Sequence, residues 1–266
     1  MSKLTGFVSI GAGNVATHLV NKLCAAGYKL LQVYSRTDES AKLLAGLHNS
    51  SFTTDSDKVI SDADFYLVSI PDQALKEFLK AFKIHNKIIF HTAGSHGTEV
   101  FGEEYMFPGV LYPLQTFTKD LGLNIEDVPV FIEARSSETL DKIESIAQSI
   151  SPKVFHSDAE TRKKIHLAAV FACNFTNHMF VVAAELMKSE GLDPSVLKPL
   201  IEETYRKSVM MNPEEAQTGP AVRNDRITMD KHINMLENQP LWQKIYIFTS
   251  QSIFFTKNSK HNNPPK

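Results

Sequence analysis

The sequence predicts an α/β fold in which a Rossmann doubly wound parallel sheet is followed by an all-α C-terminal domain. Three features indicate it: a glycine loop at 11–16, alternating strand and helix patterns up to about residue 155, and helical patterns alone beyond that point. We therefore predict a dinucleotide-binding domain at 1–155, a helical substrate and dimerisation domain at 156–257, and a disordered tail at 258–266.

The glycine loop has the pattern G-x-G-x-x-A and directly follows an apolar strand at 6–10. Gly11 can adopt the tight turn that leaves the strand, Gly13 has no side chain to block a diphosphate, and Ala16 lets the next helix pack closely. The N-terminus of that helix offers unpaired N–H groups to the diphosphate. Methyltransferases and flavoproteins use related loops, so the pattern needs its context. We expect the cofactor to contact Gly11, Ala12, Gly13, Asn14, Val15 and Ala16.

The residues after the loop indicate which dinucleotide is bound. A helix is predicted from residue 14 to 26, where Gly27 ends it, and a strand at 29–34 follows. In NAD-binding units, a carboxylate about 20 residues past the glycines receives the ribose 2′-hydroxyl. Here the stretch reads Ser35-Arg36-Thr37, and a guanidinium flanked by hydroxyls suits a 2′-phosphate. The predicted cofactor is NADP(H), bound through Ser35, Arg36 and Thr37; the alternative is that Arg36 is a solvated loop residue.

The first domain continues with alternating elements. In order, we predict a helix at 40–47, a strand at 51–54, a helical turn at 57–60, a buried strand at 64–70, a helix at 73–82, a strand at 87–91, edge strands at 110–117 and 128–133, a helix at 137–149 and a short strand at 153–155. Ligands of such sheets lie beyond the carboxyl ends of the strands. We therefore expect cofactor contacts from Ser69, Ile70, Pro71, Thr92, Ala93 and Gly94, and Ser95 is a catalytic candidate.

The second domain is predicted to contain helices only. The first spans 158–190, with Asp158 as its N-cap and Gly191 as its stop, and three more follow at 194–211, 225–238 and 240–257. The first helix is apolar nearly all round between residues 167 and 187, which requires two covered faces. We expect one face to pack on the nucleotide domain and the other on a second subunit.

Composition narrows the class of protein. The chain has 266 residues, 42% of them hydrophobic, and a formal net charge of −2, which gives no electrostatic reason to expect nucleic acid or an anionic membrane as partner. We find no apolar signal region, no 18-residue apolar span and no zinc-type ligand spacing. The prediction is a cytoplasmic protein without a metal.

Seven motifs together carry a resemblance that covers nearly the whole chain: G-A-G-N-V-A, S-R-T, V-S-I-P-D, H-T-A-G-S, Y-P-L-Q-T-F, A-A-V-F-A-C-N-F-T-N-H and T-G-P-A-V-R-N-D. The chain resembles the 6-phosphogluconate dehydrogenase-like superfamily, and within it the pyrroline-5-carboxylate reductase-like and deazaflavin-dependent NADP oxidoreductase-like proteins. It is most similar to a bacterial family of two-domain candidate NADP oxidoreductases whose helical second domain has no assigned function. The resemblance implies a Rossmann domain, a helical second domain that dimerises, and a substrate cleft between them.

The resemblance supplies only part of a catalytic apparatus. Related hydroxyacid dehydrogenases have a lysine one turn before an asparagine on the first helix of the second domain. Asn174 matches the asparagine, but Val170 occupies the lysine position, so that mechanism does not carry over. At 100° per residue, a polar stripe of His166, Asn174, Asn177 and His178 remains on this helix. Asn174 and Asn177 are catalytic candidates, whereas His166 and His178 are interpreted as core or interface histidines.

Arg223 is the candidate for substrate binding, since a guanidinium can hold a carboxylate with two hydrogen bonds. The alternative interpretation of this segment is a helix entry with Asn224 or Asp225 as N-cap. The leading functional hypothesis is an NADP(H)-dependent oxidoreductase acting on a small polar imine, keto acid or hydroxy acid, as a homodimer. The alternatives are a non-catalytic NADPH sensor acting through its helical dimer interface and an S-adenosylmethionine-dependent methyltransferase, against which Arg36 argues.

Overall fold

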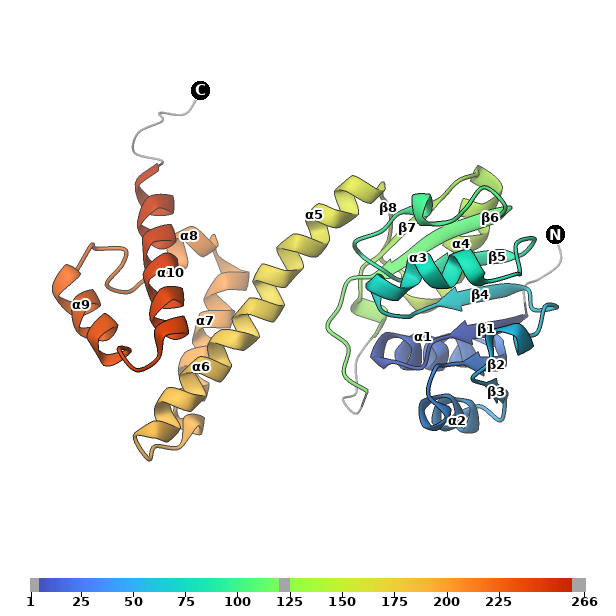
Figure 1. Cartoon of the computed structure of the whole chain (residues 1–266). Helices are drawn as coiled ribbons and strands as arrows, with labels where there is room; N and C mark the ends of the chain where they lie inside the picture. The colour runs from blue at the N-terminus through green and yellow to red at the C-terminus, as the bar shows by residue number, and fades with distance from the viewer. Residues whose placement is uncertain (1–4, 120–124, 260–266) are drawn as a thin grey trace, which may run out of the picture. The chain divides into compact units, whose positions relative to one another are not determined.

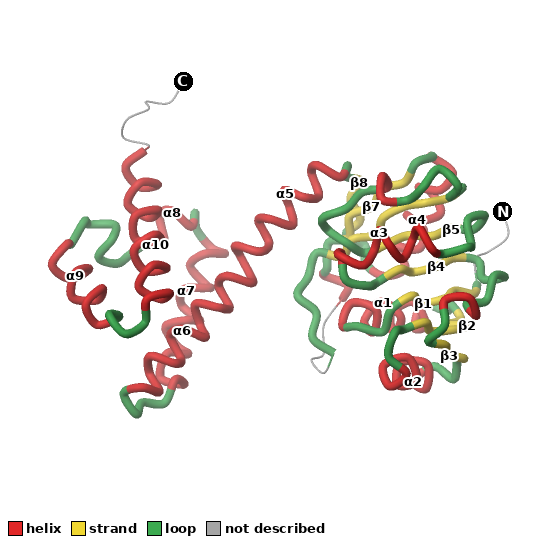
Figure 2. Tube along the Cα trace, in the orientation of Figure 1, coloured by secondary structure: helices red, strands yellow, loops and turns green. Residues whose placement is uncertain are grey.

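The computed structural model describes residues 5–119 and 125–259, and these fall into two compact units that divide between residues 175 and 176. Figure 1 shows that the first unit holds the sheet and Figure 2 that the second consists of helices and loops. The predicted fold class, a Rossmann-like α/β domain followed by a helical region, is confirmed. The predicted domain boundary near residue 155 stays a prediction, although the last strand ends at His156.

The sheet has eight strands in the order β3-β2-β1-β4-β5-β6-β7-β8. The strands are β1 (Gly6–Ile10), β2 (Lys29–Tyr34), β3 (Ser51–Thr53), β4 (Phe65–Val68), β5 (Ile88–His91), β6 (Phe107–Pro113), β7 (Val130–Ala134) and β8 (Val154–His156). All neighbouring pairs are parallel except β6 and β7. The direction of these two edge strands was not predicted. The described part of the connection at 114–129 holds no crossover helix, and a chain without a crossover returns antiparallel.

Helices cover both faces of the sheet (Figure 1). They are α1 (Asn14–Ala25), α2 (Asp38–Leu47), α3 (Asp72–Ala81) and α4 (Ser137–Ile150). Successive residues of β1 face opposite ways: Phe7 belongs to the core cluster that includes α1, α2 and α4, whereas Val8 belongs to the cluster that includes α3. The Phe7 and Phe65 rings stack with centroids 5.2 Å apart. Two buried cores therefore hold the strand ends in fixed positions.

Most predicted elements of this unit are found with shifted ends. Gly27 has φ +95° where the chain leaves α1, as its position predicts for a left-handed stop. The strand predicted at 110–117 runs from Phe107 to Pro113, and the one predicted at 64–70 ends at Val68. Both changes leave residues after the strand in loops, where they are available to a site.

The long helix predicted at 158–190 consists of α5 (Ala159–Ala169), a π-helical segment (Val170–Phe175) and α6 (Thr176–Ser189). Asp158 caps it as predicted, because its side chain accepts from Thr161 N–H at 2.7 Å, and Gly191 has φ +72° just beyond it. The π segment adds residues to a turn, so the uniform 100° spacing assumed for the stripe from His166 to His178 is wrong.

This helix also contains an apolar span that the sequence analysis missed. Within Ala159–Ser189 an 18-residue window has a mean hydropathy of 1.5, and none of the window is buried in the single chain. By length and composition alone, one helix of the described residues could cross a membrane; core helices pass the same test.

The second unit continues with a 3-10 turn (Pro194–Leu197), α7 (Lys198–Met210), α8 (Pro213–Ala216), α9 (Arg226–Met235) and α10 (Pro240–Ser259). The short helix α8 was not predicted; Pro213 begins it, and the Asn212 side chain accepts from Glu214 N–H. Asn258 and Ser259, predicted as the start of a disordered tail, are the last two residues of α10. The rest of that predicted tail, 260–266, lies outside the described residues.

Candidate functional site

A cavity of about 710 Å³ lies at the carboxyl ends of the central strands of the first unit. Its size suits a small-molecule or cofactor site. It is lined by most of the residues predicted to bind the cofactor: Gly11, Ala12, Gly13, Asn14, Val15, Ser35, Arg36, Ser69, Ile70, Pro71, Thr92, Ala93 and Gly94. Four loops far apart in the sequence therefore meet in one place.

The glycine turn has the geometry that an anion cradle requires. Gly11 has φ +115°, and a Cβ atom there would stand 2.1 Å from the Ser69 carbonyl oxygen, so no other residue fits. A Cβ on Gly13 would meet no described atom within 4 Å, which leaves open space in front of the turn. Among the described residues no side chain caps the N-terminus of α1, and its first turn has no acidic residue. Its N–H groups fit a diphosphate.

The end of β2 forms one side of the cavity. Ser35, Arg36 and Ser40 line it there, and Ser40 was not predicted. Two predicted cofactor residues do not line it. Thr37 is the N-cap position of α2, and Ala16 is fully buried in the core, where its small side chain packs α1 on the sheet. A guanidinium and two hydroxyls at this end suit a phosphate monoester.

The ends of β4 and β5 form the other side. Thr92 Oγ1 donates to Ser69 Oγ at 3.2 Å, and this bond ties the two strand ends together. The hydroxyl of Ser95 donates to the carboxylate of Asp72, the first residue of α3. Asp72 lines the cavity but Ser95 does not, so the predicted catalytic serine lies one side chain away from the cavity and orients a carboxylate.

Two aromatic side chains that the sequence analysis did not assign to the site, Tyr112 and His166, close this side of the cavity. The Tyr112 hydroxyl oxygen lies 3.0 Å from His166 Nδ1. Burial, with a smaller contribution from the negative charge of Asp72, raises the pKa of Tyr112 to about 12, so this hydroxyl is protonated at neutral pH. His166 was interpreted as a core or interface histidine; it is partly exposed and lines the cavity. Both residues belong to patterns noted in the sequence: Tyr112 begins the Y-P-L-Q-T-F motif, and His166 is part of the polar stripe.

Gly94 allows this pair to form. A Cβ atom on Gly94 would stand 2.9 Å from His166 Nδ1 and 2.9 Å from the Tyr112 ring. Any larger residue would separate the two side chains or push them out of the cavity. The sequence suggests that Gly94 allows a nicotinamide ring to approach closely. The structure adds a second reason, because Gly94 also leaves room for the side chains of Tyr112 and His166.

His91 has a structural role beneath the site. It is fully buried at the end of β5, stacks on Phe101, and its Nε2 lies 3.2 Å from the Gly97 carbonyl oxygen. Its Nδ1 accepts from Ala93 N–H at 3.2 Å, so Nε2 carries the proton. Burial lowers the pKa of His91 to about 4, and the imidazole is neutral at pH 7. The ring fixes the loop at 92–97 rather than exchanging protons with the cavity.

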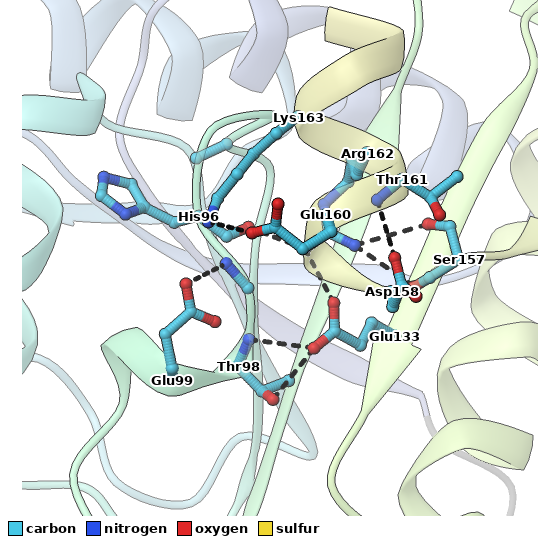
Figure 3. A network of polar contacts seen from close by, with 12 residues as sticks. His96, Thr98, Glu99, Glu133, Ser157, Asp158, Glu160, Thr161, Arg162 and Lys163 are labelled. Atoms are coloured by element: carbon cyan, nitrogen blue, oxygen red, sulfur yellow. Dashed lines mark hydrogen bonds and ion pairs between the residues drawn. The ribbon is translucent and has the colours of Figure 1, made fainter.

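A buried ion pair anchors α5 to the sheet (Figure 3). Arg162 is 0% exposed and its Nη2 lies 2.8 Å from Glu133 Oε2 on β7, while the same nitrogen donates to the His96 carbonyl oxygen at 2.7 Å. Glu133 Oε1 accepts from the N–H and hydroxyl of Thr98. The Arg162 to Glu133 contact is an ion pair without hydrogen-bond geometry, since Oε2 has no hydrogen-bond partner among the described residues. His166 follows Arg162 by one helical turn, so this anchor places it.

The remaining predicted residues lie outside the part of the first unit that forms the cavity. Asn174 is exposed in the π-helical segment, and Asn177 and Arg223 belong to the second unit. Asp225 caps α9 by accepting from Thr228 N–H at 3.1 Å, as the alternative interpretation of that segment expected. Their catalytic and substrate roles stay predictions. The described residues contain no group of three His, Cys, Asp or Glu side chains that could hold a metal ion.

Comparison with known proteins supports this arrangement. Residues 6–93 match the family described as NADP oxidoreductase coenzyme F420-dependent, and residues 128–253 match a domain family of unknown function, DUF2520. A crystal structure of a candidate NADP oxidoreductase from Bacteroides fragilis is 43% identical, with a TM-score of 0.89 over 94% of this chain and 98% of that one. No functionally curated protein matches the chain.

More distant structures share the fold. An imine reductase from Myxococcus stipitatus in complex with NADP+ is 13% identical, with a TM-score of 0.64 over 97% of this chain and 94% of that one. A 1-pyrroline-5-carboxylate reductase from Streptococcus pyogenes is also 13% identical, with a TM-score of 0.59 over 94% of this chain and 98% of that one. At this identity the likeness concerns the fold alone.

Proposed function

Because this chain belongs to the NADP oxidoreductase family of the Bacteroides fragilis protein, we propose that it binds NADP(H) in the cavity of its first unit and transfers hydride to or from a small polar substrate. The substrate class is an imine or a keto or hydroxy acid. The observation that carries the proposal is the convergence in one cavity of the glycine turn, Arg36 and the small polar ends of β4 and β5. The fold is shared with a 1-pyrroline-5-carboxylate reductase and with an imine reductase in complex with NADP+, which is compatible with this substrate class.

Each part of the cavity has a binding task in this proposal. The α1 N-terminus binds the diphosphate, and Arg36 with Ser35 and Ser40 binds the 2′-phosphate. The nicotinamide half then extends over the ends of β4 and β5, because the adenosine half occupies the β2 side. When bound, the nicotinamide supplies or accepts the hydride. The chain's own residues orient it and exclude water.

The 2′-phosphate assignment predicts a cofactor-selective loss. Arg36→Ala is expected to weaken NADPH binding about 10- to 150-fold, the value of a hydrogen bond to a charged group, and to leave NADH binding nearly unchanged. Isothermal titration calorimetry with both nucleotides measures it. Lys42→Ala on the exposed side of α2 is the matched control and should alter neither affinity. Equal losses for NADPH and NADH would reject the assignment.

The alternative function, a non-catalytic NADPH sensor, is favoured by Val170 at the position of the dehydrogenase lysine. A panel of imines and keto acids incubated with NADPH separates the two functions. Tritium transferred from labelled NADPH into any product ends the sensor hypothesis. Tight NADPH binding without turnover on the whole panel would favour it.

We also propose a cytoplasmic homodimer that covers the apolar surface of the helix at 159–189. Leu167 and Phe171 are 58% and 62% exposed in the single chain, which is too much apolar surface for a monomer. Phe171→Glu is expected to convert a dimer into a monomer in sedimentation velocity, whereas Lys164→Glu on the same helix should not. A wild-type monomer that binds phosphatidylcholine vesicles would contradict the dimer.

A further inference from the structure

We propose that His166 is the proton donor of the reaction, acting through Nε2, and that Tyr112 is a positioning residue that holds the imidazole by its Nδ1. This inference rests on the proposed function and adds to it the group that completes hydride transfer. It also supplies what the chain lacks at Val170, where related dehydrogenases carry a lysine.

The first support for this proposal is the position of His166 and Tyr112 in the cavity. The cavity extends from Arg36 at the end of β2, past the glycine turn of β1, to Thr92, Ala93 and Gly94 at the end of β5. A dinucleotide with its 2′-phosphate at Arg36 and its diphosphate at the turn must place its nicotinamide at the β5 end. His166 and Tyr112 line that end, in contact distance of Gly94.

The orientation of the imidazole is the second support. Nδ1 is taken by the Tyr112 hydroxyl, and the described residues give Nε2 no hydrogen-bond partner. Because Nδ1 is held by Tyr112 and His166 lines the cavity, we infer that the other ring nitrogen, Nε2, faces the cavity. A histidine with one nitrogen fixed by the protein and the other facing a cavity has the arrangement of a general acid.

The chemistry favours the histidine over the tyrosine as donor. A catalytic acid must give up and regain a proton readily, and imidazole is the side chain suited to this near neutral pH. The Tyr112 hydroxyl, with its raised pKa, is a poor acid but a stable hydrogen-bond partner at neutral pH. Burial of its ring also keeps it in place.

The step balances as follows. The substrate carbon of C=N or C=O receives a hydride with its two electrons from the reduced nicotinamide, and the π electron pair moves to nitrogen or oxygen. That atom takes the Nε2 proton of the His166 imidazolium, giving an amine or alcohol, the oxidised nicotinamide and a neutral imidazole. Nδ1–H donates to the Tyr112 oxygen before and after the transfer, and solvent returns the proton to Nε2.

Charged and titratable groups from three elements face the pair. They are Asp72 on α3, Arg162 one turn earlier on α5, and Cys173 in the π-helical segment. The negative charge of Asp72 raises the pKa of Tyr112, and the positive charge of Arg162 lowers it. His91, with its pKa near 4, stays neutral over the pH range of a binding experiment, and His96 is the remaining histidine of the neighbouring loop.

The test compares the two oxidation states of the cofactor without any substrate. A cationic nicotinamide repels an imidazolium, by about 1 kcal/mol for unit charges 4 Å apart in water, whereas the reduced ring carries no charge. The ratio of the NADP+ to the NADPH dissociation constant should therefore rise about fivefold between pH 8 and pH 5.5. The titration of the 2′-phosphate near pH 6 cancels in this ratio, because both nucleotides carry it.

His166→Gln should make the ratio independent of pH, and the matched control His96→Gln should leave its pH dependence unchanged. Tyr112→Phe should move the midpoint to lower pH, since the imidazolium loses the acceptor of its Nδ1–H; a purely structural tyrosine would leave the midpoint in place. If His166→Gln does not fold, NMR titration of the wild-type His166 ring in its NADP+ and NADPH complexes gives the same comparison.

Several results would overturn the proposal. A flat ratio in the wild type, or a pH dependence that survives in His166→Gln, would remove His166 from the vicinity of the nicotinamide. Either result can be obtained with tight NADPH binding intact, so it is distinct from failure of the proposed function, in which the nucleotide does not bind. Once a substrate is found, imidazole added to His166→Ala should restore part of the lost turnover.

Discussion

Alanine at Gly13 is expected to leave the protein folded and to weaken NADPH binding about 100-fold. The protein has open space at this position, so the new Cβ meets no described atom and the fold accepts it. The same space is where a diphosphate must approach the α1 N-terminus, and losing two hydrogen bonds to a charged group costs about 3 kcal/mol or more. Calorimetric titration with NADPH measures the loss.

Gly11→Ala should behave differently from Gly13→Ala. Its Cβ would collide with the Ser69 carbonyl oxygen at a backbone angle that only glycine adopts readily, so we expect a loss of about 3 kcal/mol in stability as well as of binding. Far-UV circular dichroism is the suitable probe, because the single tryptophan, Trp242, lies in the second unit.

Gly46→Ala, in α2 with open space around its Cβ, is the matched control for both glycine variants. It should raise stability by about 0.5 to 1 kcal/mol and leave binding unchanged. NADPH affinity equal to wild type in Gly13→Ala would show that the glycine turn is structural and not a cofactor cradle.

Glu133→Gln is expected to lower the free energy of unfolding by about 3 kcal/mol and to disturb the site. The substitution leaves Arg162 fully buried without a counter-charge, and breaking a buried pair on one side is costly. Because Glu133 is partly exposed, we expect a loss of stability at the lower end of the range for breaking a buried ion pair. Because Arg162 anchors the turn before His166, the pH dependence of the NADP+ to NADPH ratio should weaken too.

Two further variants isolate this ion pair. Arg162→Met removes the buried charge, and the double variant with Glu133→Gln should be less destabilised than the sum of the two single ones. Glu138→Gln breaks the exposed pair with Lys142 on α4 and should cost about 0.5 kcal/mol or less. Additive losses in urea unfolding would mean that Arg162 and Glu133 act independently.

The first half of the chain was predictable to a large extent, because local signals there agree with the tertiary structure. The glycine turn, the apolar run before Ser69 and the stop at Gly27 are each specified by a few neighbouring residues. These signals identified the cofactor side of the cavity as well. The reversed strand β7 was not predicted, since the direction of a strand depends on the path of its connection and not on its own residues.

The proton-donor side was not found for a related reason. Tyr112 lies 54 residues from His166, and nothing local in either segment indicates that their side chains meet. The stripe argument also assumed a uniform α-helix, and the π-helical segment at 170–175 changes which residues share a face. Asn174 and Asn177 were selected on that assumption.

The sequence by itself determined the Rossmann architecture, the NADP type of cofactor and the diphosphate turn. Each of these depends on the identity and spacing of residues that are close together in the chain, and on the backbone angles that those residues can adopt. Only the tertiary structure decided that Gly94 makes room for Tyr112 and His166 and that Glu133 holds the buried Arg162. Those contacts join residues from separate strands and helices, and their energies depend on burial and distance that arise only when the sheet and α5 have packed together.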